Sequence, residues 1–163
     1  MDTTDILIKI RRIVRSINME SKKIQKEHGV SIPQVLCLGY LKSTTDYQAT
    51  QGQIKEFLNL NSSTVSGIIN RLEKKGFIAR LPKKGDKRVV NLALTATGDH
   101  LLNSIPKLLH DRLSNKLDHL EVVKINQIES SLNTLIDILD ISDLEASPII
   151  VNDFDLDDSP EKF

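Results

Sequence analysis

The 163-residue chain has no tryptophan and a single cysteine, and only 4% of its residues are aromatic. One cysteine excludes a disulfide framework and any zinc site built from several cysteines. Because aromatic side chains are so few, the core must be aliphatic. The apolar runs are far shorter than the roughly 20 residues that a membrane span needs, and the first residues lack the features of a secretory signal. We therefore expect one compact cytoplasmic domain that does not bind a membrane.

Signatures of catalysis are also missing. The chain has no glycine-rich phosphate loop, no local Ser/His/Asp signature and no helical His-Glu-x-x-His motif. No two of its histidines stand at the i, i+4 spacing of a helical metal site; they are His28, His100, His110 and His119. We expect neither an enzyme nor a metal or other cofactor. Cys37 lies between two leucines with no cation nearby in sequence, which favours core packing over oxidant sensing.

The net charge of zero hides a segregation of the two signs. Residues 141–163, an acidic tail, hold seven acids and one base. Residues 71–88, here the basic window, hold two acids and eight bases: Arg71, Lys74, Lys75, Arg80, Lys83, Lys84, Lys87 and Arg88. Such a window in a near-neutral body is typical of a polyanion footprint. Two roles stay open for the tail: competing with DNA for the basic window, or docking through Ile149–Val151 on the helices.

Apolar spacing predicts long helices at both ends of the chain. Residues 4–27 form the first, which Gly29 ends, and Ser31 caps a second with Pro33 in its first turn. A third helix is expected from Ala96 to His119, kinked at Pro106. The last, residues 121–140, carries an apolar stripe of Val122, Ile125, Ile128, Leu132, Leu135, Ile136 and Leu139.

Between these helices, residues 50–94 predict two short helices and a hairpin. Thr50 and Gln53 form a capping box that opens a helix with inward residues Ile54, Phe57 and Leu58. A tight turn at Asn59-Leu60 leads to a helix from residue 62 to 75, which Gly76 ends. Strands follow at 77–81 and 89–94, joined by a charged tip.

The helix from residue 62 to 75 has two different faces. Its apolar face, at the spacing of a buried helix side, consists of Val65, Ile68, Ile69 and Leu72. Its polar face holds small, polar or basic residues and no carboxylate: Ser63, Ser66, Gly67, Asn70 and Lys74. Such a face can approach a phosphate backbone and offer hydroxyl and amide groups to base edges. With the preceding helix and turn it makes a helix-turn-helix, beside which the hairpin forms a wing.

Over residues 50–98 the sequence resembles the MarR family of bacterial winged helix-turn-helix transcriptional regulators. The resemblance is carried by the recognition-helix segment 61–80, by the wing motif Asp86-x-Arg88 and by Leu94-Thr95-x-x-Gly98. Two positions depart from the family pattern: Lys55 stands where alanine is usual, and Gly67 stands where many members have a larger side chain.

The resemblance implies a mainly α fold with a small β-hairpin wing. It implies a dimerisation region made of the N-terminal helix (1–30) and the C-terminal helices (96–140), a DNA-binding lobe (31–95) and the acidic tail (141–163). Such a homodimer would bind double-stranded DNA at a pseudo-palindromic operator, typically as a repressor released by a small-molecule effector. The alternative is a winged-helix module that binds only protein.

The resemblance also implies which residues bind DNA, and they lie on the helix from residue 62 to 75 and on the wing. By the wing motif, Asp86 would brace the wing through an ion pair while Arg88 enters a minor groove. The full set is Ser62, Ser63, Thr64, Ser66, Gly67, Asn70, Arg71, Lys74, Lys83, Lys84, Asp86, Lys87 and Arg88. On the first helix, the bases Lys9, Arg11, Arg12 and Arg15 indicate a solvated face, or else line a pocket for an anionic ligand.

Overall fold

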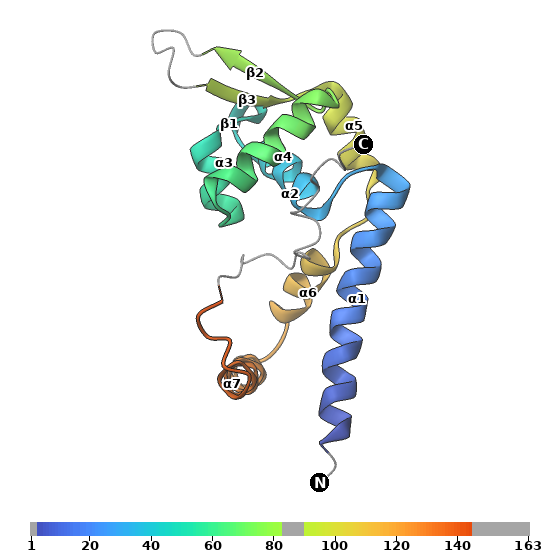
Figure 1. Ribbon diagram of the computed structural model, residues 1–163, viewed down its shortest axis with the longest axis vertical. Coiled ribbons are helices and arrows are strands. Elements are labelled where there is room, and N and C mark those ends of the chain that lie inside the picture. The colour runs from blue at the N-terminus through green and yellow to red at the C-terminus, as the bar shows by residue number, and fades with distance from the viewer. Residues whose placement is uncertain (1–2, 83–89, 145–163) are drawn as a thin grey trace, which may run out of the picture. The chain divides into compact units, whose positions relative to one another are not determined.

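A computed structural model describes residues 3–82 and 90–144 of the chain. Figure 1 shows a mainly helical protein with one small sheet. The described elements are α1 (Thr4–His28), α2 (Ile32–Ser43), the 3-10 turn η1 (Thr45–Tyr47), β1 (Gln48–Thr50), α3 (Gln51–Leu58), α4 (Ser62–Lys74), β2 (Ile78–Pro82), β3 (Val90–Leu94), α5 (Ala96–Ser104), α6 (Leu109–Leu117) and α7 (Val122–Ile138). The chain divides into two compact units between Pro106 and Lys107, with α1 to α5 in the first and α6 and α7 in the second.

The core of the first unit surrounds α2. This helix is apolar on nearly every side, and it is in contact with α1, α3, α4, α5, β1 and β3. Its buried residues are Ile32, Pro33, Gln34, Val35, Leu36, Cys37, Leu38 and Leu41. The neighbours contribute further aliphatic side chains, among them Ile54, Leu58 and Leu92. The structure thus confirms the aliphatic core and the burial of Cys37.

Local hydrogen bonds fix both helices of the helix-turn-helix. The Thr50 N–H donates to Gln53 Oε1 (2.8 Å), and the Gln53 N–H donates back to Thr50 Oγ1 (3.2 Å), so the predicted capping box is present. Asn59 ends α3 in the left-handed conformation, with φ at 50°. Asn61 Oδ1 then accepts from the Thr64 N–H (2.8 Å) and starts α4. Because every one of these bonds spans few residues, sequence alone predicted the turn.

The sheet contains one strand more than the sequence predicted. The antiparallel pair β2 and β3 is the expected hairpin, while β1 pairs with the other edge of β3, with Ala49 opposite Leu92. A three-residue strand has no detectable period, and its partner lies some forty residues further along the chain. The segment between β2 and β3, with Lys83, Lys84, Asp86, Lys87 and Arg88, lies outside the described residues.

Phe57 is not the inward residue that the helical spacing predicted. Its side chain is 40% exposed, whereas Ile54 and Leu58 are fully buried. The Phe57 ring stacks on that of Tyr40 in α2, with centroids 4.4 Å apart and planes inclined by 17°. Because Ile54 and Leu58 already cover the inner face of this short helix, Phe57 lies at its edge.

The prediction of one kinked helix from Ala96 to His119 is also wrong. Helix α5 ends at Ser104, and α6 begins only at Leu109. Proline disfavours the helical conformation of the residue before it, and Ile105 accordingly is extended, with φ −85° and ψ 131°. Pro106 therefore breaks the helix instead of bending it, and the break lies at the boundary between the two units.

Thr95 and Gly98 join the start of α5 to the end of α4. Thr95 Oγ1 accepts from the Gly98 N–H (3.1 Å) and donates to the Gly76 carbonyl (2.7 Å), while the Thr95 N–H donates to the Phe77 carbonyl (3.1 Å). A Cβ on Gly98 would lie only 2.2 Å from Phe77 O. The glycine is therefore required by a close approach of backbone to backbone.

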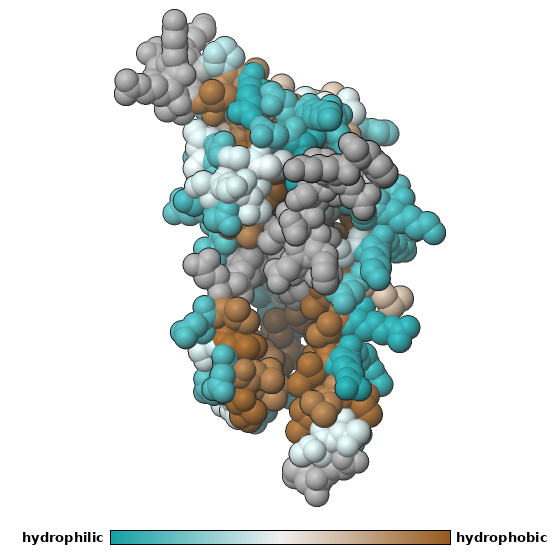
Figure 2. Space-filling view, viewed as in Figure 1, coloured by the Kyte–Doolittle hydropathy of each residue, from teal (hydrophilic) through white to brown (hydrophobic). Residues whose placement is uncertain are grey.

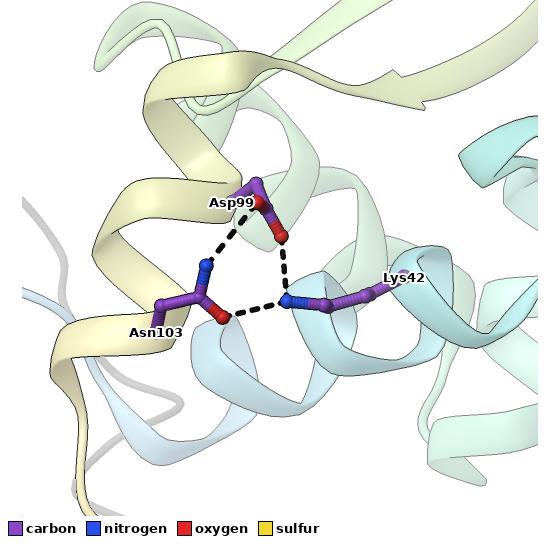
Figure 3. A network of polar contacts seen from close by, with 3 residues as sticks. All are labelled: Lys42, Asp99 and Asn103. Carbon is purple, nitrogen blue, oxygen red and sulfur yellow. Dashed lines mark hydrogen bonds and ion pairs between the residues drawn. The ribbon is translucent and has the colours of Figure 1, made fainter.

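A polar network joins α5 to the last turn of α2 (Figure 3). Lys42 Nζ lies 2.7 Å from Asp99 Oδ1 and donates to Asn103 Oδ1 (2.6 Å), and Asn103 Nδ2 donates to Asp99 Oδ2 (3.2 Å). The hydrogen bond from Lys42 lowers the pKa of Asp99 below its ordinary value. Since Lys42 and Asp99 are both partly exposed, the ion pair contributes little stability, but it fixes how α5 lies on α2.

Helices with little apolar cover occur in both units. Neither α6 nor α7 buries a residue, and α1 buries only Ser21 and Ile24. Figure 2 shows hydrophobic surface over α7 and, separately, over the N-terminal half of α1. In the described parts of the chain, no helix combines the length and apolar character needed to cross a membrane.

We expect Gly98→Ala to destabilise the protein by about 3 kcal/mol, because the added methyl group forces Phe77 and α5 apart. The free energy of unfolding in urea measures the change. Gly39→Ala is the matched control: it lies inside α2, no atom lies within 4 Å of its ideal Cβ, and replacing a helical glycine stabilises by up to about 1 kcal/mol. Equal stabilities for the two variants would contradict the close approach at Gly98.

Candidate nucleic-acid interface

Helix α4 has the two faces that the sequence predicted. Its apolar side is fully buried through Val65, Ile68, Ile69 and Leu72, each at most 1% exposed. On the opposite side Ser63, Asn70 and Lys74 are exposed, and Ser66 and Gly67 are half-buried. The structure thus brings these five predicted residues together on one face of one helix, which we call the polar face of α4.

The N-terminus of α4 adds a positive end to this face. Ser62 and Ser63 are exposed there and Thr64 is half-buried, with no acidic residue in the first turn. The first N–H groups of a helix and its dipole together attract anions such as phosphate. All three residues were predicted to contact DNA, and they lie where a phosphate group could approach the helix.

Ser66, in the middle of the polar face, is held by a residue that the sequence analysis did not place in the site. Gln51 Nε2, at the start of α3, donates to Ser66 Oγ over 2.7 Å. The bond joins the two helices of the helix-turn-helix, and it orients the Ser66 hydroxyl. Gln51 lies between the two residues of the capping box, Thr50 and Gln53, and no local sequence pattern links residues fifteen positions apart.

Asn70, one turn further, is held from the sheet. Arg80 of β2 donates from Nη2 to Asn70 Oδ1 (2.6 Å) and from Nε to Glu73 Oε2 (2.8 Å). Glu73 is the one carboxylate in the sequence of α4, and the ion pair with Arg80 compensates its charge. Arg80 was counted only as a charge of the basic window, so its contact with a predicted site residue was missed.

The other described bases of the window, Arg71, Lys74 and Lys75, have different surroundings. Lys75 donates to the Gly29 carbonyl at the end of α1, so it joins two helices. Arg71 passes beside Gly67, where an ideal Cβ would lie 4.0 Å from Arg71 Nη2. Lys74 is exposed on the polar face. Five of the predicted residues, Lys83, Lys84, Asp86, Lys87 and Arg88, belong to the segment outside the described residues.

Two other kinds of site were weighed in the sequence. Across residues 3–82 and 90–144, no three His, Cys, Asp or Glu side chains gather as metal ligands would. Cys37 is fully buried in α2, and burial raises the pKa of its thiol to about 12. A thiol in this environment stays protonated at neutral pH and is a poor nucleophile.

Hydroxyl, amide and basic groups thus share the polar face of α4, and the single carboxylate of the helix is paired. Such a surface can contact the phosphate backbone of a nucleic acid and place polar side chains near base edges. An α-helix also has the diameter that the major groove of B-DNA admits.

Comparisons with known proteins agree with this geometry. Residues 30–90 match the model of the MarR family. The chain is 35% identical over 110 residues to the HTH-type transcriptional regulator PecS of Dickeya dadantii (strain 3937), covering 67% of this chain and 64% of that protein. It is 30% identical over 96 residues to the HTH-type transcriptional repressor MdtR of Bacillus subtilis (strain 168), covering 59% of this chain and 61% of that protein. The chain thus matches slightly less than two thirds of the length of both.

The fold is shared with a protein whose structure has been solved in complex with DNA. The crystal structure of the S. aureus MepR–DNA complex is similar with a TM-score of 0.61 and 22% identity, over 80% of this chain and 95% of that one. The fold of α helices with a small sheet is therefore that of winged helix-turn-helix proteins, as the sequence predicted. Both relatives carry names of transcriptional regulators, and neither name is that of an enzyme.

Burial of Cys37 leads to a test of thiol reactivity. We expect the native protein not to react with Ellman's reagent near neutral pH, because a thiol with a pKa of about 12 is protonated there. The same protein unfolded in guanidinium should react fully, which is the internal control. Rapid reaction of the native protein would contradict the packing of Cys37 in the core and would favour the oxidant-sensing alternative.

Proposed function

Because residues 30–90 match the model of the MarR family, we propose that this chain is a transcriptional regulator that binds double-stranded DNA as a homodimer. In this proposal α4 is the recognition helix and enters the major groove. Its residues Ser62, Ser63, Thr64, Ser66, Gly67, Asn70, Arg71 and Lys74 contact DNA, and the wing contributes Lys83, Lys84, Lys87 and Arg88, braced by Asp86.

The observation that carries the proposal is the polar face of α4. A helix buried on one side through four aliphatic residues has a fixed orientation, so its other side is presented in one geometry. That side has no unpaired carboxylate to repel phosphate, and it offers Ser63, Asn70 and Lys74. The protein-binding alternative gives no reason for this combination, which matches what phosphate and base contacts require.

The relatives support the same reading of the molecule. S. aureus MepR, whose fold this chain shares, is bound to DNA in its structure, and the B. subtilis relative is named a repressor. We therefore include repression in the proposal. The operator would be a pseudo-palindrome, because a dimer with two-fold symmetry presents two identical recognition helices to the two half-sites.

The homodimer is supported by the uncovered apolar stripe of α7. Val122 is 70% and Leu132 51% exposed, and Ile128, Ile136 and Leu139 are exposed on the same side of the helix. An apolar surface of this kind marks an interaction site. We assign it to a second copy of the chain, with the exposed isoleucines of α1 as a further part of the contact.

Release by a small molecule is the last part of the proposal, and a feature of α1 supports it. A shallow hollow of about 470 Å³ on this helix combines three cations with apolar side chains; it is lined by Ile10, Arg11, Val14, Arg15, Asn18, Met19 and Lys22. This composition suits a small anion with an apolar body. The bases of the first helix would then bind the charged group of that ligand.

DNA binding is tested with Lys74→Ala. A duplex enriched from randomised DNA is titrated in a salt series and followed by fluorescence anisotropy. We expect the variant to bind all sequences more weakly and to lower the slope of log Kd against log salt by about one per subunit, because one phosphate contact is lost. Lys9→Ala removes an exposed lysine from α1 and is the matched control, with an unchanged slope.

The same titration separates the two functions considered. A winged helix that binds only protein would enrich no DNA sequence, and its weak binding would not depend on Lys74. That result would overturn the proposed regulator and favour the protein-interaction module.

The dimer is tested by adding a charge to either side of α7. We expect the protein to have twice the chain mass in light scattering at micromolar concentration, and Leu132→Glu to be a monomer, because a carboxylate cannot be buried in an apolar contact without a partner. Ser130→Glu adds the same charge on the opposite side of the helix and should leave the dimer intact. A monomeric wild-type protein would refute the assignment of the stripe.

A further inference from the structure

The polar face of α4 is constrained from behind by two hydrogen bonds, and the bond to Asn70 has consequences for base recognition. The Arg80 guanidinium is held at two points, by Glu73 Oε2 at Nε (2.8 Å) and by Asn70 Oδ1 at Nη2 (2.6 Å). All three residues belong to α4 or β2 of the first unit. An arginine bound by two partners has a fixed plane, and it therefore fixes the Asn70 amide.

An asparagine amide carries its acceptor and its donors on opposite branches. Because Oδ1 faces Arg80, Nδ2 with its two N–H groups occupies the other branch of the planar group. Oδ1 keeps a second lone pair, but the guanidinium charge beside it opposes the approach of any further N–H donor. Asn70 therefore acts toward an incoming base as a donor.

The Ser66 hydroxyl, one turn before Asn70, is likewise held so that it acts as a donor. Gln51 Nε2 donates to its hydroxyl oxygen (2.7 Å), and a hydroxyl that accepts keeps its own proton to donate. Between the two lies Gly67, beside which the Arg71 guanidinium passes. The middle of the polar face thus combines two oriented polar groups with a cation, and both polar groups have accepted a bond from inside the protein.

Base edges in the major groove differ in what they offer to such a face. Guanine presents two acceptors, N7 and O6, whereas adenine presents the N7 acceptor beside the N6 amino donor. The usual pairing of asparagine with adenine needs the amide oxygen to accept from that amino group. In this protein the amide oxygen is already bound to a cation.

We propose that Arg80 is a positioning residue that turns the Asn70 amide into a donor, so that the base pair contacted by Asn70 is read as guanine and adenine is rejected. The proposal rests on the proposed DNA-binding function and adds to it the chemistry of one operator position. Arg80 does not itself touch the base; it acts through Asn70 from the strand behind the helix.

The test is a selection of bound duplexes from randomised DNA, carried out with the wild-type protein and with variants. Comparison with Asn70→Ala identifies the base pair whose preference depends on Asn70. At that pair we expect the wild-type protein to favour guanine over adenine by at least about fivefold, the lower range for a good base contact. In Arg80→Ala the amide is released, and the preference should move toward adenine.

Two further variants separate amide orientation from a merely structural role of Arg80. Glu73→Gln removes the ion pair but keeps the bond from Arg80 to Asn70, so its base preference should equal that of the wild-type protein. Asn70→Asp keeps a partner for Arg80 but has no N–H donor, and a carboxylate accepts from cytosine N4, so guanine should be replaced by cytosine. The result for Asn70→Asp can be interpreted even if Arg80→Ala fails to fold.

Each outcome decides the proposal. Adenine at the Asn70-dependent pair of the wild-type protein would overturn it, as would an Arg80→Ala preference identical to wild type. A shift in Glu73→Gln equal to that in Arg80→Ala would also overturn it, because loss of the ion pair alone would then suffice. Enriched operators with no Asn70-dependent pair would refute this inference and leave the DNA-binding function standing, whereas no enrichment at all would refute both.

Discussion

The protein depends on one constraint: α2 is apolar on nearly all sides and must be covered on all of them. A helix of this kind is stable only when other elements surround it. In the first unit α3, α4, α5 and the sheet contact α2, and α3, α4 and the sheet contribute buried aliphatic side chains to its cover. The orientation of α4 follows from this packing. Its buried side is fixed by the core, and its polar side is consequently presented to solvent in a single orientation.

Polar contacts refine what the apolar core positions. The bonds from Gln51 to Ser66 and from Arg80 to Asn70 reach the polar face of α4 from the neighbouring helix and strand. Thr95 ties α5 to the turn after α4, and the Lys42 network ties α5 to α2. Each bond between exposed groups contributes little free energy. Their importance lies in direction, because they fix how the Ser66 hydroxyl and the Asn70 amide are presented on the polar face.

In the second unit the apolar side chains of the helices are not covered. Helices α6 and α7 have apolar side chains and bury none of them, and the N-terminal half of α1 is in the same condition. In the described residues the aliphatic core surrounds α2, whereas α6 and α7 contribute no buried side chain. A partner chain that covers these helices would couple assembly to DNA recognition, since two lobes can contact two half-sites only while the helices hold them together.

The sequence by itself determined most features that depend on near neighbours, although not the break at Pro106. The spacing of Val65, Ile68, Ile69 and Leu72 predicted the buried side of α4, and the capping box at Thr50 predicted where α3 begins. Five residues of the polar face followed from the same spacing, because helical periodicity is a local property. The sequence therefore predicted both the polar face and the helix-turn-helix with its wing.

Only the tertiary structure decided which distant residues meet. Strand β1 pairs with β3, Phe57 is displaced to stack on Tyr40, and Gly98 leaves room for the Phe77 carbonyl. Arg80 orients Asn70 in the same way, across a strand and a helix. None of these contacts has a period or a motif in the sequence, because each depends on how already formed elements pack. The sequence thus specified the polar face of α4, while packing specified which of its polar atoms are already bonded inside the protein.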